Sequence, residues 1–170
     1  MDKKNLRSQL RERLEQMTPG VRQRKSQAAG ELLCQSPEFQ QARVVMMFLS
    51  IPGELDTISI IRQGLGGKTV LVPKINWDKW LLIPVELRSL DEPMEFHRYG
   101  LQWPTDRPDF PLERIELVIV PGLGFDETGR RIGRGGRFLR PVPGPAGVAG
   151  AQLRPGLRGA GRSRGSHRPA

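Results

Sequence analysis

Apolar positions in the first 65 residues recur mainly with helical spacing. Leu6, Leu10, Leu14 and Met17 lie three or four residues apart, which predicts an opening helix with Asp2 as a possible N-cap. Thr-Pro, Ser-Pro and Asp-Thr pairs are capping signals that predict the starts of three further helices. The expected helical segments are residues 2–17, 19–33, a short helix near residue 39, and 57–65.

Four apolar runs of strand length lie between or after these helices. They are "RVVMMFLS" (43–50), "KTVLVP" (68–73), "WLLIPVEL" (80–87) and "IELVIVPG" (115–122). Continuous apolar runs are typical of strands buried on both faces of a parallel sheet, and Pro84 favours an edge position for the third run. The alternation of helix and strand up to residue 122 predicts an α/β domain with a mostly parallel sheet.

Ligands of such sheets bind beyond the carboxyl ends of the strands. Three loops are expected there, namely "SIPGELDT", "PKINWD" and "PGLGFDETGRRIGRGG". The third has the strongest signal, because its glycines between residues 133 and 136 allow a close backbone approach and their N–H groups can cradle phosphate. Arg131 and Arg134 add fork-shaped phosphate donors, and Asp126 could cap, turn or orient. A glycine-rich surface turn with solvated arginines is the alternative.

The net charge of +9 is not spread evenly along the chain. Seven arginines, but no acidic residue and no lysine, follow residue 136, which leaves 20 basic and 18 acidic residues in 1–136. This near-neutral body argues against a nucleic-acid partner. The single cysteine, Cys34, fits a buried thiol in a reducing compartment. No apolar run suits a membrane span, and the charged N-terminus is not a secretory signal, so we expect a cytoplasmic protein.

Several other residues could carry chemistry, but each has a plainer interpretation. A carboxylate at Glu54 could accept hydrogen bonds from a heterocycle, although an ordinary loop acid is favoured from the residues alone. Lys3, Lys4 and Arg7 could reach a phosphate, although a solvated helix face is the default. His97 has no partner motif, and no metal-ligand spacing or Ser/His/Asp motif is visible. Core or rim packing is favoured for three tryptophans that could also stack on a flat ligand: Trp77, Trp80 and Trp103.

Three segments together resemble one enzyme family. "KKNLR" near the start, "FLSIPGELDT" after the first strand and "VIVPGLGFDETGRRIGRGG" resemble 5-formyltetrahydrofolate cyclo-ligase, also called methenyltetrahydrofolate synthetase, over residues 3–136. The resemblance implies a three-layer α/β/α sandwich. It also implies an enzyme that uses ATP and Mg²⁺ to convert 5-formyltetrahydrofolate to 5,10-methenyltetrahydrofolate, with release of ADP and phosphate. That chemistry needs positioning and charge neutralisation more than a protein nucleophile.

The resemblance also implies roles for individual residues, with Arg134 as the catalytic residue. Leu49 and Glu54 would hold the folate, with Glu54 reading the pterin, and Arg134, Gly135 and Gly136 would lie against the same substrate. Lys3 and Arg7 would contact phosphates. The full set implied for ATP is Lys3, Lys4, Asn5, Leu6, Arg7, Arg131, Ile132, Gly133, Arg134, Gly135 and Gly136.

The chain departs from the family pattern after Gly136. The family continues approximately as "GRGGGFYDRFLA", whereas this chain reads "GRGGRFLRPVPG", so that Arg140 stands in place of an aspartate that helps to bind magnesium. Arginine cannot ligate a cation, so no protein metal ligand is expected. A permitted codon choice for residues 137–144, read one base later, encodes "GFYDRFLA". Residues 153–161 similarly permit "CGLAFEEQV", which resembles the family's next strand.

We therefore interpret residues 1–136 as an incomplete cyclo-ligase-like domain and 137–170 as a frame-shifted, disordered Pro/Gly/Arg-rich tail. The C-terminal part of the sandwich would be truncated or replaced, the strand near Val120 would have a free edge, and this chain would have little activity. One alternative is a genuine arginine-rich tail that binds nucleic acid or an acidic partner. Another is a different phosphate-binding α/β enzyme, such as a sugar-phosphate isomerase. A monomer acting on a small molecule is favoured.

Overall fold

The computed structural model describes residues 2–79, 81–135 and 151–153. It contains four α-helices near the expected positions: α1 (Lys3–Glu15), α2 (Pro19–Gln35), α3 (Pro37–Gln41) and α4 (Ile58–Leu65). The predicted caps operate at α2 and α3, where the Thr18 and Ser36 hydroxyls accept hydrogen bonds from the Val21 and Phe39 N–H groups. Asp2 occupies the N-cap position of α1 but makes no side-chain capping bond.

The strands form one central sheet and two small ones. The central strands are β1 (Val44–Met46), β2 (Thr69–Asn76), β3 (Leu81–Leu87), β6 (Leu117–Ile119) and β9 (Ala151–Leu153). The small sheets are the pairs β4 (Met94–Phe96) with β5 (Gln102–Pro104), and β7 (Gly124–Phe125) with β8 (Arg131–Ile132). Short 3₁₀ turns, η1 (Arg98–Gly100) and η2 (Leu112–Arg114), link some of these elements.

The central sheet has the order β3-β2-β1-β6-β9, with a parallel centre. Strand β1 pairs in parallel with β2 on one side and with β6 on the other. Strand β3 forms an antiparallel hairpin with β2, so Pro84 lies on an edge strand as predicted. Strand β9 pairs antiparallel with β6. The expectation of a free edge at this strand is therefore wrong, because backbone of residues 151–153 fills the edge.

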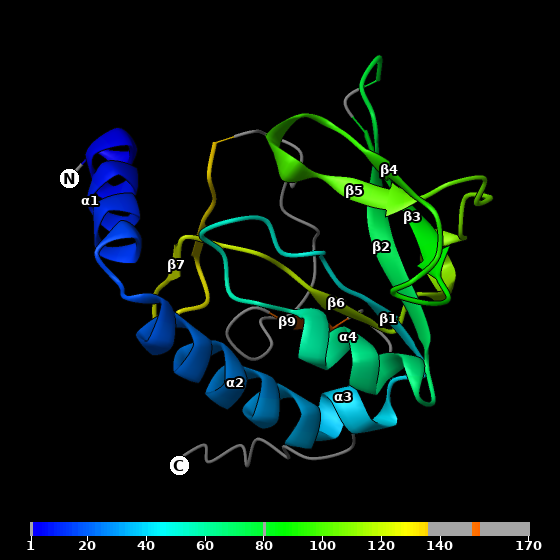
Figure 1. Cartoon of the computed structure of the whole chain (residues 1–170). Helices are drawn as coiled ribbons and strands as arrows, with labels where there is room; N and C mark the ends of the chain where they lie inside the picture. Colours follow the sequence, from blue (N-terminus) through cyan, green and yellow to red (C-terminus); the bar gives the residue numbers. More distant parts are fainter. Residues whose placement is uncertain (1, 80, 136–150, 154–170) are drawn as a thin grey trace, which may run out of the picture.

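Alternate residues of the parallel strands bury two apolar surfaces. Val45 and Leu117 are fully buried in the larger core, and α2, α3 and α4 lie over this face of the sheet (Figure 1). Met46 and Leu71 point to the opposite face, where the segment around Phe110 packs against them. Each parallel strand thus contributes to two layers, which explains its continuous apolar sequence.

Three strand boundaries differ from the sequence predictions. Strand β1 ends at Met46 instead of near residue 50. The Met47 N–H still donates to the Leu71 carbonyl of β2, but beyond it the Phe48 carbonyl and the Ser50 N–H bond to the Thr57 hydroxyl. Strand β6 likewise ends at Ile119, short of the predicted residue 122. Strand β2 continues through Pro73 to Asn76. The predicted ligand loop "PKINWD" is thus wrong as a loop, since four of its six residues pair with β3.

The predictions for the C-terminal segment fall largely outside the described residues. Its frame shift and disorder concern residues 137–170, of which only 151–153 are described, as β9. The domain boundary at residue 136 stays a prediction for the same reason. Within the described part of the chain, no helix is long and apolar enough to cross a membrane.

Candidate active site

The loop after β6 begins with a small hairpin, β7–β8, and its glycine-rich segment, residues 131–135, starts at the second strand of that hairpin. A tight turn closes this hairpin, because one Asp126 carboxylate oxygen accepts hydrogen bonds from the N–H groups of Thr128 and Arg130 and from the Thr128 hydroxyl. These bonds, led by the Thr128 hydroxyl, lower the pKa of Asp126 from its ordinary value. Of the three roles considered for Asp126, the structure shows that of a turn residue. The hairpin presents the following residues, Gly133–Gly135, at its open end.

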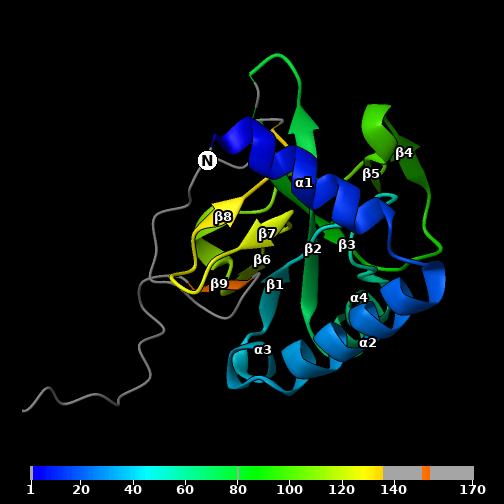
Figure 2. The same cartoon turned by 90° about the vertical axis from the view of Figure 1, so that its left-hand side faces the viewer.

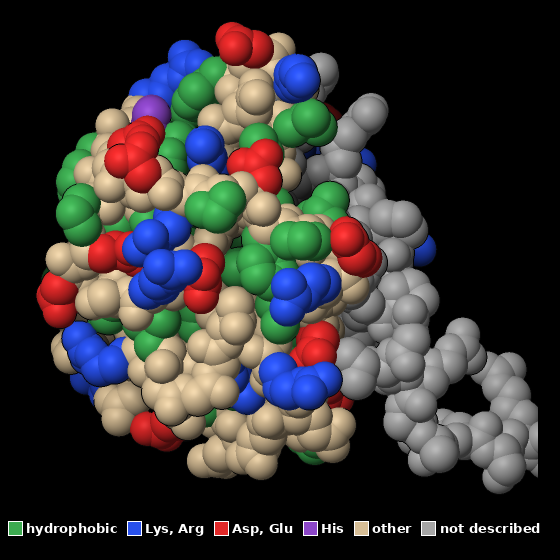
Figure 3. Space-filling view, turned by 90° about the vertical axis from the view of Figure 1, so that its right-hand side faces the viewer, with side chains coloured by type: hydrophobic (Ala, Val, Ile, Leu, Met, Phe, Trp, Pro, Cys, Tyr) green, Lys and Arg blue, Asp and Glu red, His purple; other side chains and the backbone are tan. Residues whose placement is uncertain are grey.

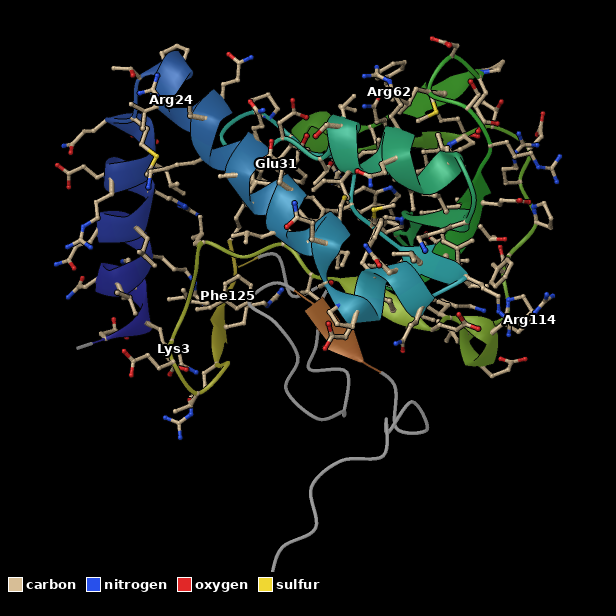
Figure 4. All side chains as sticks on the ribbon, turned by 90° about the horizontal axis from the view of Figure 1, so that it is seen from below. Lys3, Arg24, Glu31, Arg62, Arg114 and Phe125 are labelled. Atoms are coloured by element: carbon tan, nitrogen blue, oxygen red, sulfur yellow. The ribbon has the colours of Figure 1, made fainter. Side chains whose placement is uncertain are left out.

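Helix α1 packs on this hairpin and holds the segment that follows it (Figure 2). A methyl group added to Gly124 would lie 3.2 Å from Leu10, so helix and hairpin are in close contact. Arg7 Nε donates to the Gly133 carbonyl at 3.1 Å, and an Arg11 guanidinium nitrogen donates to the Arg134 carbonyl at 2.8 Å. Figure 4 shows Lys3 at the start of α1, beside the hairpin that carries Phe125.

Arg131 supports the loop from within. Its guanidinium donates to the Pro121 carbonyl at 2.9 Å, and burial lowers its pKa. A methyl group added to Gly133 would lie only 2.8 Å from this guanidinium, so a larger residue there would displace the Arg131 side chain. The side chain that sequence analysis assigned to phosphate therefore also ties β8 back to the end of β6.

Glu54 lies in the loop between β1 and α4 and meets the glycine-rich segment. The Glu54 carboxylate accepts one hydrogen bond from the Ile51 N–H at 3.2 Å and another from Arg134 Nε at 3.2 Å. The ion pair is largely shielded on the Glu54 side, whose side chain is 16% exposed, and less so on the Arg134 side, at 36%. Gly53 adopts φ +86, and a methyl group there would lie 3.4 Å from the Arg134 guanidinium.

The structure thus brings predicted site residues from α1, the Glu54 loop and the glycine-rich segment to one place. Some of them take part through side chains and others through backbone carbonyls. Arg7 bonds to Gly133 and Arg134 bonds to Glu54, and the two hydrogen bonds are linked because Gly133 and Arg134 are consecutive in the chain. Leu49 is only 8% exposed, so its side chain is part of the larger core. The remaining predicted residues lie on α1, on β8 or just after β8. Lys3, Lys4 and Asn5 of α1 are exposed, Leu6 of α1 and Ile132 of β8 are half-buried, and Gly135 after β8 is exposed. Gly136 lies outside the described residues.

A pocket of about 470 Å³ opens beside Glu54. Its wall includes Glu15 and Met17 at the end of α1, Arg22 of α2, and Asp56 of the loop before α4. An Arg22 guanidinium nitrogen donates to the Leu14 carbonyl at 2.6 Å, whereas the buried Arg22 Nε has no hydrogen-bond partner among the described residues. A second pocket of about 370 Å³ lies between α2 and α4 and lacks Glu54 and the glycine-rich segment. The geometry therefore favours the Glu54 side for chemistry.

Three features around this region could not be predicted from the sequence. In the sequence Arg11 is one of several charged residues of the first helix, and nothing in its spacing indicates that it reaches the Arg134 carbonyl. Arg22 gave no signal either. The sequence indicates no partner for His97, yet its ring stacks on Trp103 with 3.9 Å between the ring centres. The packing predicted for Trp103 is confirmed, since it is 2% exposed, and the buried position of Cys34 is confirmed as well, at 7%.

Comparisons with known proteins agree on a single family. The sequence model of the 5-formyltetrahydrofolate cyclo-ligase family matches residues 1–140. The 5-formyltetrahydrofolate cyclo-ligase of Escherichia coli K12 is 32% identical over 133 residues, covering 76% of this chain and 72% of that protein. The Mus musculus protein of the same name is 28% identical over 141 residues, covering 78% and 69%.

Solved structures share the fold. The 5,10-methenyltetrahydrofolate synthetase of Aquifex aeolicus superposes with a TM-score of 0.70 at 24% sequence identity, over 79% of this chain and 68% of that one. A 5,10-methenyltetrahydrofolate synthetase from Mycoplasma pneumoniae gives 0.61 at 16% identity, over 80% and 73%. The layered α/β architecture predicted from the sequence is therefore confirmed.

Proposed function

Because this chain belongs to the 5-formyltetrahydrofolate cyclo-ligase family, we propose that it converts 5-formyltetrahydrofolate to 5,10-methenyltetrahydrofolate at the expense of ATP, releasing ADP and phosphate. The observation that carries the proposed site is the ion pair between Arg134 and Glu54. It joins the segment assigned to ATP with the loop assigned to the folate. A phosphoryl group and the folate must meet in this reaction, so adjacent sites are what the chemistry requires.

The nucleotide is proposed to bind between the start of α1 and the glycine-rich segment. Backbone N–H groups of residues 133–135 and the Arg134 guanidinium would face the phosphates. Lys3 is exposed and free to turn toward them, and Arg7 lies against the same segment through its bond to Gly133. Arg131 contributes by fixing the end of β8 against Pro121.

The folate is proposed to bind on the Glu54 side of the ion pair. The Glu54 carboxylate is oriented by the Ile51 N–H, which leaves lone pairs that can accept N–H donors of the pterin. Leu49, a member of the larger core, would contribute apolar surface to the folate. Arg134 would then lie between the two substrates, where its positive charge can serve both.

The proposed chemistry has two steps. The formyl oxygen attacks the terminal phosphorus of ATP, the bond from that phosphorus to the bridging oxygen breaks, and ADP leaves. A neighbouring folate nitrogen then attacks the activated formyl carbon, the carbon–oxygen bond breaks, phosphate leaves, and the nitrogen loses its proton. Arg134 stabilises negative charge on the transferred phosphoryl oxygens in both steps, which is the main catalytic requirement of such transfers.

The described residues do not form a magnesium site of their own. They contain no cluster of three or more His, Cys, Asp or Glu side chains suited to a metal ion. Arg140, which stands where the family pattern has an aspartate, lies outside the described residues. Protein-bound Mg²⁺ usually shares its coordination with substrate phosphates. The steps above assign catalytic roles only to protein side chains and give none to a metal ion. The missing aspartate is the reason to expect slow turnover by this chain.

Nucleic-acid binding is the less favoured function. Figure 3 shows acidic and basic side chains interspersed over one face of the molecule, without a large area of a single sign. The excess positive charge lies after residue 136. A small-molecule folate substrate, a monomeric state and a cytoplasmic location remain our proposals.

The proposed function is tested by binding before turnover. Isothermal titration of the full chain with 5-formyltetrahydrofolate and with a non-hydrolysable ATP analogue should show binding of both. Glu54→Gln should weaken folate binding about tenfold, because it removes the charge that accepts pterin N–H groups, and should spare the nucleotide. Arg134→Ala should weaken both ligands. A full chain that binds neither ligand would overturn the proposal, as would an E54Q variant that binds folate normally.

A further inference from the structure

The β4–β5 hairpin places a turn directly beside the loop between β1 and α4, residues 48–57, which carries Glu54 and is called the folate loop below. Residues Arg98–Gly100 form this turn, η1, which the His97 N–H closes by donating to the Leu101 carbonyl at 2.8 Å. A methyl group added to Gly100 would lie 3.5 Å from Pro52 and 3.7 Å from Ile51. The turn therefore borders the loop that carries Glu54.

The turn is anchored firmly on its inner side. The His97 ring stacks on Trp103, which is 2% exposed and belongs to the larger core. The Glu95 carboxylate lies 3.3 Å from His97 Nε2, so this acidic group is engaged on the same strand. A turn that is fixed at its base holds its exposed side chains in place before any ligand arrives, which lowers the entropic cost of binding.

The outer side of the turn presents a cation and an aromatic ring. The Arg98 guanidinium lies 4.0 Å above the centre of the Trp77 ring and 5.9 Å from that of Tyr99. No carboxylate among the described residues pairs with Arg98, which is exposed. Tyr99 is 70% exposed and adopts φ 67, a left-handed conformation that is unusual for a bulky residue. An arginine stacked on an indole keeps its N–H edges available to an anion.

We propose that Arg98, Trp77 and Tyr99 form a subsite for the p-aminobenzoylglutamate tail of the folate, an inference that rests on the proposed function. With the pterin on Glu54, the elongated tail leaves across Pro52 toward η1. Arg98 binds a glutamate carboxylate with its fork of N–H donors, and Tyr99 stacks against the benzoyl ring. The chemistry of the tail, one aromatic ring followed by carboxylates, matches the chemistry of the turn.

The test compares a folate with and without its tail. The full chain and its Arg98→Ala variant are titrated with 5-formyltetrahydrofolate, with its triglutamate, and with a 5-formyltetrahydropterin that lacks the tail. We expect R98A to weaken binding of both folates about tenfold and to leave the tailless pterin and a non-hydrolysable ATP analogue unaffected. Arg114→Ala is the matched control, because Arg114 also stacks on an aromatic ring, Phe110, at 5.3 Å, but away from the folate loop.

A second variant separates a binding role from a structural one. Tyr99→Gly removes the ring and also relieves the left-handed backbone, so it should weaken folate binding while the melting temperature stays equal or rises. Normal folate affinity in R98A would overturn the subsite. An equal loss for folate and tailless pterin would overturn it too, because the defect would then lie in the folding of the turn. Failure of the unaltered chain to bind either compound would instead overturn the proposed function, and the subsite with it.

Discussion

Two arginines of α1 hold the glycine-rich segment by its backbone. Arg7 and Arg11 are one helical turn apart, and they donate to the carbonyls of the consecutive residues Gly133 and Arg134. These bonds fix the orientation of the peptide units whose N–H groups would face phosphate. Arg11 itself contacts neither substrate in the proposed site, so we assign it a positioning role.

Arg11→Ala should therefore raise the KM for ATP several-fold, about the loss of one charge-assisted hydrogen bond, while the KM for folate changes less. Arg11→Lys should recover much of the ATP affinity, because an ammonium group can also donate to the Arg134 carbonyl. Arg13→Ala is the matched control, since Arg13 is an exposed arginine of the same helix. Equal effects of R11A and R13A on ATP binding would show that helix charge, and not the bond to the loop, matters.

Gly53 provides a second test at the scale of one residue. It adopts φ +86 beside the Arg134 guanidinium, so Gly53→Ala forces a Cβ into a strained conformation. We expect a loss of about 1–2 kcal/mol in the free energy of unfolding, measured with urea. Gly67→Ala is the control, because a methyl group at Gly67 would meet nothing within 4 Å and no positive φ is required there. Equal stability of the two variants would contradict the strain argument.

The helices and the buried strands were predictable because their signals are local. Thr18 and Ser36 cap helices within three residues of themselves, and the apolar run around Val45 needs only burial on both faces. The antiparallel β2–β3 hairpin was less visible, since Pro73 and Pro84 look like strand breakers until they are seen to lie opposite each other. The contacts of Arg11 and Arg98 join residues far apart in sequence or on separate hairpins, where no local pattern reports them.

The connection from β3 to β4 has a pH-dependent element. Burial alone would raise the pKa of Glu92, but hydrogen bonds from the Arg88 and Ser89 N–H groups and from Arg107 outweigh it, so the pKa is lowered. The Glu92–Arg107 pair is mostly buried, with side chains 10% and 21% exposed. A lowered pKa in the folded state means that ionised Glu92 stabilises the fold above its ordinary pKa, and that this stabilisation is lost as the pH falls through the folded value.

Glu92→Gln should consequently cost about 2 kcal/mol of unfolding free energy at neutral pH, and the difference from the unaltered chain should shrink below about pH 4.5. Urea unfolding at neutral and acidic pH measures both values. Glu86→Gln is a suitable control, because Glu86 also pairs with an arginine, Arg88, in a more exposed setting with side chains 35% and 61% exposed. A Glu92 difference that does not vary with pH would show that shape, and not charge, provides the stabilisation.

At the scale of the whole molecule, the described residues form both sides of the proposed site. Three segments form this site: the N-terminal helix (residues 3–15), the folate loop (48–57) and the glycine-rich segment (131–135). The central sheet brings them together. The resemblance found in the sequence covered these same segments in order, which is why most residues of the proposed site could be named in advance. Their mutual contacts could not be named, because they depend on how the hairpin β7–β8 packs against α1.

The altered sequence after Gly136 gives the last prediction. If codons 137 onward are read one base later, an aspartate replaces Arg140, and a carboxylate stands where Mg²⁺ and ATP phosphates would meet. We expect that chain to turn over 5-formyltetrahydrofolate on the order of 100-fold faster than the chain as written, since transition-state charge is then neutralised. A chain that ends at Gly136 is the control, because it loses residues 137–170, including strand β9, without gaining the aspartate, and it should remain slow. Equal turnover by the written and the shifted chains would reject the frame-shift interpretation, and fast turnover by the control would identify the tail as an inhibitor.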